Sequence, residues 1–180
     1  MDTTPGDVLK WWFSPAQRAL WYAKDADFDA QIRRHFLTVY EAACAGVLDH
    51  WRKAPDSLLA LIIVLDQFAR NMFRGSARAF AADPHAVLLP KEGLDNGFDS
   101  HLTLQQWDFL TMPLMHSESL EDQELLQQLI TTRGQQENRY ARQHYETIAR
   151  FGRFPHRNET LGRESTAEEK LFLEQRHLSI

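Results

Sequence analysis

The chain has little cysteine and lacks the common motifs of covalent catalysis. Its 180 residues include one cysteine, Cys44, so no internal disulfide bond can form. Cys44 lies among alanines near the end of a predicted helix, where we expect a small buried apolar residue, not a nucleophile. There is no glycine-rich phosphate loop and no Gly-x-Ser-x-Gly turn. The sequence therefore gives no support to catalysis by a covalent nucleophile.

The chain also lacks an excess of positive charge and a long apolar run. Lysine and arginine number 20 against 25 aspartate and glutamate, a net charge of −5, so we expect no nucleic-acid partner. The longest apolar run, Leu58–Leu65, is far shorter than the roughly 20 residues that span a bilayer. No polybasic segment or signal-peptide pattern is present, so we expect no membrane partner and a cytoplasmic location.

No segment alternates apolar and polar residues between turn residues, so we predict no β-strand. Apolar residues recur instead every three or four positions, and 43% of the residues are hydrophobic. The expected fold is all-α. We predict about eight or nine helices packed as antiparallel hairpins, without a sheet, in one domain over residues 1–180 with short frayed ends.

Residues 58–75 form the helix around which the chain is organised. Its first half, Leu58–Leu65, is apolar on every side, so it should be buried all round. Its second half carries a polar stripe, which comprises Asp66, Gln67, Arg70, Asn71 and Arg74. The stripe either lines a ligand-binding cleft or is a surface stripe supported by Asp66 and Arg70, which are four residues apart.

Prolines and glycines divide the later helices. Pro90 and Gly93 fall inside a helix that begins at Asp83, and we expect a kink or early stop there. Pro113 should interrupt the helix that begins after Thr103.

Two four-residue patterns are typical of helix N-termini. Ser119 is followed by Asp122, which resembles a capping box, and Thr166 is followed by Glu169, which is a regular one.

Three histidines and one glutamate are candidates for chemistry. His116 and Glu118 lie next to a predicted helix break, and three interpretations fit them. They form an acid–base pair, they are metal ligands, or they have a capping or core role. His144 lies on an apolar helix face, where it is a core residue or a ligand. Together with His156 these histidines lack the spacing of a metal site. We therefore predict no metal and no cofactor.

The loop over residues 150–158 is rich in arginine and aromatic residues. We predict that His156, Arg157 and Asn158 bind a ligand, because arginine forks suit carboxylate or phosphate groups. The alternative is a loop tied down by arginine hydrogen bonds to helix C-termini.

The same segments resemble a bacterial domain-of-unknown-function family, nine-two-four. Leu61–Gly75 is similar to its pattern Leu-Asp-Gln-Phe-Pro-Arg-Asn-Met-Phe-Arg-Gly, and Pro113–Glu118 to its Pro-x-x-His-Ser-Glu motif. Residues 151–169 resemble its C-terminal motif, and the likeness runs from about residue 8 to 172. It implies a tetratricopeptide-like helical fold and no established activity. Ala69 replaces the family's proline, which implies the loss of a kink in the organising helix.

Two functions fit these patterns. In the first, Arg70, Arg74 and Arg157 hold a small anionic ligand, a phosphate or carboxylate compound, and Asn71 orients it. His116 or His144 would then be the general acid or base, oriented by Glu118 or Asp66. The second function is a tetratricopeptide-like module that binds a peptide or protein without catalysis. We place the anion site first and leave open whether the protein is an enzyme.

Overall fold

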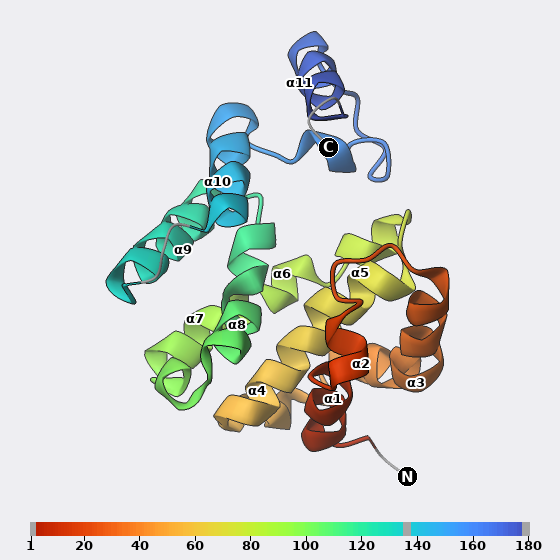
Figure 1. Ribbon diagram of the computed structural model, residues 1–180, viewed down its shortest axis with the longest axis vertical. Helices are drawn as coiled ribbons and strands as arrows, with labels where there is room; N and C mark the ends of the chain where they lie inside the picture. Colours follow the sequence, from red (N-terminus) through yellow and green to blue (C-terminus); the bar gives the residue numbers. More distant parts are fainter. Residues whose placement is uncertain (1–2, 135–137, 178–180) are drawn as a thin grey trace. The chain divides into compact units, whose positions relative to one another are not determined.

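The computed structural model describes residues 3–134 and 138–177, and within these ranges every regular element is a helix (Figure 1). The prediction of an all-α fold without a sheet is confirmed for this part of the chain. Eight of its α-helices have eight residues or more. The expected frayed ends concern residues 1–2 and 178–180, which lie outside the described ranges.

The chain divides into two compact units, which we describe separately. The first comprises Met1–Arg74 and Arg78–Pro113, and the second comprises Gly75–Ala77 and Leu114–Ile180. That residues 1–180 form one domain stays a prediction. Within the ranges that the structure covers, no helix is long and apolar enough to cross a membrane.

The elements of the first unit are short helices in close succession. They are α1 (Pro5–Trp12), α2 (Pro15–Arg18), α3 (Ala26–Cys44), η1 (Asp49–Lys53), α4 (Pro55–Ile62), η2 (Ile63–Phe68), α5 (Ala69–Met72), η3 (Ala77–Phe80), α6 (Asp83–Ala86), α7 (Leu88–Asp95), η4 (Phe98–His101) and most of α8 (Leu104–His116). The second unit contains the end of α8 and the helices α9 (Leu120–Thr132), α10 (Arg139–Phe151), η5 (Pro155–Arg157) and α11 (Ala167–His177).

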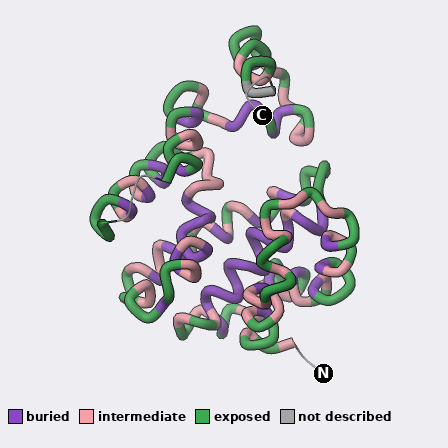
Figure 2. The backbone as a smooth tube through the Cα atoms, in the orientation of Figure 1, coloured by how far each residue is buried: buried purple, intermediate pink, exposed green. Residues whose placement is uncertain are grey.

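The helix α4 forms the core of the first unit. Every residue of Leu58–Leu65 is at most 1% exposed, and α4 packs against α1, η1 and α7 (Figure 2). The prediction of a helix buried on all sides is confirmed. Trp12 of α1, whose ring contacts those of Phe28 and Phe68, adds a fully buried aromatic group to this core.

The organising helix is not regular, although the resemblance implied the loss of a kink. Ile63–Phe68 is a π-helix, which carries the wider turns that often occur at functional positions. The N–H group of Ala69 donates to the carbonyl of Asp66, a hydrogen bond that proline could not form. Ala69 therefore adds a main-chain hydrogen bond at the end of the π-helix, which the family resemblance did not imply.

The prolines affect their helices unequally. The helix that begins at Asp83 breaks at Val87, one turn before Pro90, as expected from the clash of a proline ring with the preceding turn. The prediction for Pro113 is wrong, because α8 continues through it to His116. Pro113 lies in the last turn, so the missing N–H group removes only one hydrogen bond from the end of the helix.

Two further local predictions are corrected. Ser119 makes no side-chain cap; instead Ser117 donates to Asp122 at 2.6 Å and accepts from the Ser119 N–H group. Cys44 is exposed, because it lies on the solvent side of the last turn of α3. Thr166 and Glu169, in contrast, form the predicted capping box.

Candidate functional site

The polar stripe of the first unit is organised around Arg70. Its guanidinium group donates to both oxygens of Asp83, at 2.7 and 2.8 Å, and to the carbonyl of Ala79. It lies 3.6 Å from the carboxylate of Asp66 and stacks over the ring of Phe80, 4.8 Å from its centroid. Arg70 therefore neutralises two carboxylates, and these contacts give it a structural role.

Asp66 and Gln67 lie inside the protein, although the sequence placed them on a stripe that opens where burial ends. Asp66 is 1% exposed and Gln67 is 8% exposed. The amide nitrogen of Gln67 donates to Asp66 at 2.6 Å and to the sulfur of Met112 at 3.0 Å. Both side chains belong to the π-helix, where the wide turn directs polar groups into the core.

The remaining stripe residues contact the first turn of α3. Arg74 donates to both oxygens of Asp29, at 2.7 and 2.9 Å, and Asn71 donates to the same carboxylate at 2.8 Å. The hydrogen bonds that Arg74 donates to the Asp29 carboxylate raise the pKa of Arg74. The sequence analysis missed Asp29 and treated Asp83 only as a helix start, since no local pattern links a carboxylate to an arginine so distant in sequence.

The second unit brings together three histidines and an arginine, which we name the histidine–arginine cluster: His116, His144, His156 and Arg157. His144, His156 and Arg157 surround the buried ring of Phe154, and His116 lies beside His144. The ring of His144 lies 5.2 Å from that of Phe154 and 6.4 Å from that of His116. The ring of His156 lies 5.5 Å from Phe154, and the guanidinium carbon of Arg157 lies 4.5 Å from its centroid.

Three helical segments position the cluster. His116 ends α8, His144 lies in α10, and His156 and Arg157 lie in η5. Arg157 is 5% exposed and donates to the carbonyl of His116 at 2.9 Å. This bond matches the alternative interpretation of the loop, an arginine tied to a helix C-terminus, and it also fixes the guanidinium group beside the histidines.

The orientation of His144 is set by its own helix. Its Nδ1 atom lies 2.8 Å from the carbonyl of Tyr140, which can only accept a hydrogen bond, so Nδ1 carries the proton. His144 is half-buried.

Glu118 supports the cluster. Its carboxylate accepts from the Phe154 N–H group at 2.7 Å and from Arg163 at 2.7 and 2.9 Å. Burial alone raises the pKa of Glu118, but the hydrogen bonds from Arg163 and Phe154 outweigh it and hold the pKa below its usual value. Glu118 therefore stays ionised near neutral pH and holds the loop, and Arg163 is a site residue that the sequence analysis did not select.

Asn158 also has a structural position. Its amide donates to the hydroxyl of Ser165 at 3.0 Å and accepts from Arg163 at 2.9 Å. Arg153 binds both oxygens of Glu169, at 2.7 and 2.8 Å. These contacts join the loop to the start of α11, so ligand binding by Asn158 stays a prediction.

Within the ranges that the structure describes, no group of three or more histidine, cysteine, aspartate or glutamate side chains is arranged to hold a metal ion.

Comparisons with known proteins agree with the fold and leave the chemistry open. A family model described as "Bacterial protein of unknown function (DUF924)" matches residues 8–177. The chain is similar to the solved structure of a protein of unknown function from Agrobacterium tumefaciens, with 36% sequence identity and a TM-score of 0.88. This similarity covers 95% of this chain and 97% of that one. No curated protein matches the sequence.

Proposed function

The chain belongs to the DUF924 family of bacterial proteins of unknown function, and we propose from its own residues that it binds a small anionic ligand at the histidine–arginine cluster. The ligand is a phosphate or carboxylate compound. The observation that carries the proposal is the gathering of His144, His156 and Arg157 around the ring of Phe154, with His116 beside His144. Each of these side chains donates hydrogen bonds or carries positive charge when protonated.

The chemistry of the cluster favours an anion over a cation or an apolar molecule. Arginine presents several N–H donors in a fixed fork that matches carboxylate and phosphate oxygens. An anion beside a histidine ring favours its protonated form, so ligand binding and protonation reinforce each other. Arg153 and Arg163 are excluded as ligand contacts because Glu169 and Glu118 hold them in bidentate pairs.

Arg70 and Arg74 are not included in this proposed site. Asp83 and Asp29 bind them at hydrogen-bond distance in the first unit. An anion at either arginine would have to displace a carboxylate from its partner.

The test uses inorganic phosphate as the probe. Thermal unfolding is followed with increasing phosphate, against sodium chloride of equal ionic strength, because charge screening alone also shifts stability. We expect phosphate to raise the Tm, since a ligand at about 100 times its Kd stabilises the folded state by roughly 2.7 kcal/mol. His144→Gln with His156→Gln should remove most of this increase, and His101→Gln in the first unit is the matched control.

Two results would overturn the proposal. The first is an equal Tm change with phosphate and with sodium chloride. The second is a phosphate effect that the double variant retains in full. Circular dichroism of the variants separates loss of binding from loss of fold.

A further inference from the structure

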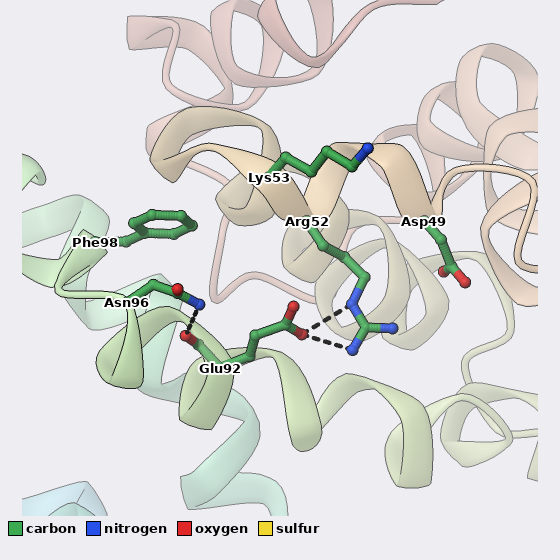
Figure 3. Close-up of a pocket in the computed structure, with 6 residues that line it drawn as sticks. All are labelled: Asp49, Arg52, Lys53, Glu92, Asn96 and Phe98. Atoms are coloured by element: carbon green, nitrogen blue, oxygen red, sulfur yellow. Dashed lines mark hydrogen bonds and ion pairs between the residues drawn. The ribbon is translucent and has the colours of Figure 1, made fainter.

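A second candidate site lies in the first unit, between η1 and the end of α7. It is a depression of about 460 Å³, a size within the range of small-molecule sites. Its lining comprises Asp49, Arg52, Lys53, Glu92, Asn96 and Phe98 (Figure 3). No residue of the histidine–arginine cluster belongs to this lining.

A salt bridge between Arg52 and Glu92 lies at the centre of the depression. It does not use all the hydrogen-bonding atoms of the two side chains. Arg52 donates from Nε and Nη2 to a single oxygen of Glu92, Oε2, at 2.8 and 2.6 Å. Figure 3 shows the two side chains pointing toward each other across the depression. This geometry leaves the Oε1 atom of Glu92 and the Nη1 atom of Arg52 for another partner. Both side chains are about one third exposed, so a ligand can reach them.

The lining contains equal numbers of positive and negative groups. Arg52 and Lys53 contribute two positive charges, and Asp49 and Glu92 contribute two negative charges. A lining of this composition has no preference for a purely anionic or purely cationic ligand. It matches a molecule that carries one charge of each sign a few ångströms apart.

An aromatic ring and an amide complete the lining. The ring of Phe98 is half-buried and lies beside Asn96, whose amide nitrogen donates to the main-chain carbonyl of Glu92 at 2.8 Å. The amide is therefore held in place, and the partly exposed ring offers apolar surface to a ligand. The face of an aromatic ring also attracts an ammonium group.

We propose that this depression binds a free α-amino acid with an apolar side chain. The ligand ammonium group is recognised by Glu92 and Asp49, its carboxylate by Lys53 and Arg52, and its side chain by Phe98. The proposal rests on contacts in the first unit alone, so it does not depend on anion binding in the second unit.

The experiment measures binding of L-phenylalanine to the full chain by isothermal titration calorimetry. Two analogues are matched controls: 2-phenylethylamine lacks the carboxylate, and 3-phenylpropionate lacks the ammonium group. We expect measurable binding of phenylalanine, and at least about tenfold weaker binding of each analogue, because each loses a charge-assisted hydrogen bond.

Variants then assign the site. Lys53→Gln and Asp49→Asn change exposed side chains and should each raise the Kd for phenylalanine about tenfold. Lys24→Gln, another exposed lysine of the first unit, should leave the Kd unchanged. His144→Gln should also leave it unchanged, which separates this site from the histidine–arginine cluster.

Three results would overturn the proposal: no heat of binding for phenylalanine, equal affinity for an analogue that lacks one charge, or an unchanged Kd in both Lys53→Gln and Asp49→Asn.

Discussion

Arg163 binds the carboxylate of Glu118 through two hydrogen bonds of 2.7 and 2.9 Å, across 45 residues of the chain. The same carboxylate accepts from the N–H group of Phe154, the residue at the centre of the histidine–arginine cluster. Glu118, which lies just after the end of α8, thus binds the loop that carries His156 and Arg157. This relationship gives the shape of the loop a physical cause within the second unit, because one ionised glutamate binds both the Arg163 side chain and the main chain of Phe154.

Glu118→Gln should destabilise the second unit. The amide cannot accept from Arg163 at both positions, so we expect a loss of about 1–3 kcal/mol in the free energy of unfolding, measured by urea denaturation. Glu121→Gln changes an exposed residue of α9 and is the matched control. An equal loss in both variants would contradict the role of Glu118.

The pair of Arg153 and Glu169 predicts a pH dependence. The hydrogen bonds from Arg153 lower the pKa of Glu169 from 4.5 to about 2. Because the folded pKa is depressed, the contribution to stability is complete above pH 4.5 and is lost as the pH falls toward about 2.

Glu169→Gln should therefore lower the free energy of unfolding by about 2 kcal/mol near neutral pH, and by much less near the acid end of this window. Glu168→Gln, whose side chain is 61% exposed, should change stability by less than about 0.5 kcal/mol at either pH. If the free energy of unfolding of the two variants depends on pH in the same way, Glu169 does not have the proposed role at the start of α11.

Arg70 and Arg74 predict losses of different size. Arg70→Ala removes the positive charge between Asp66 and Asp83, and Asp66 is fully buried, so we expect a loss of about 3 kcal/mol. Arg74→Ala removes a side chain that is 41% exposed, and the expected loss is about 1 kcal/mol. Urea denaturation measures both. Equal losses in the two variants would contradict the claim that the burial of an ion pair determines how much it contributes to the free energy of unfolding.

Local patterns in the sequence predicted the all-α fold and the buried organising helix, but not every helix boundary. The all-apolar run Leu58–Leu65 predicted a buried helix because such a segment has no side suited to water. The capping box of Thr166 and Glu169 could be predicted because its two residues are three positions apart in the sequence. The π-helix at Ile63–Phe68 could not be predicted, because the wider turn depends on packing and has no residue pattern of its own.

The candidate site was only partly predictable for the same reason. The residue types of His116, His144 and Arg157 indicated chemistry, but their gathering beside Phe154 and one another depends on how α8, α10 and η5 pack. The bonds of Arg74 to Asp29 and of Arg163 to Glu118 each cross 45 residues. Sequence spacing carries no information about pairs at that separation, so arginines with internal partners were predicted to bind a ligand.

The most direct test of the proposed anion site is nuclear magnetic resonance of the histidine side chains during a phosphate titration at constant ionic strength. We predict that the ring signals of His116, His144 and His156 shift together and saturate with one Kd, while those of His35, His50 and His101 in the first unit do not move. Equal small shifts of all six, without saturation, would contradict a specific anion site at the histidine–arginine cluster.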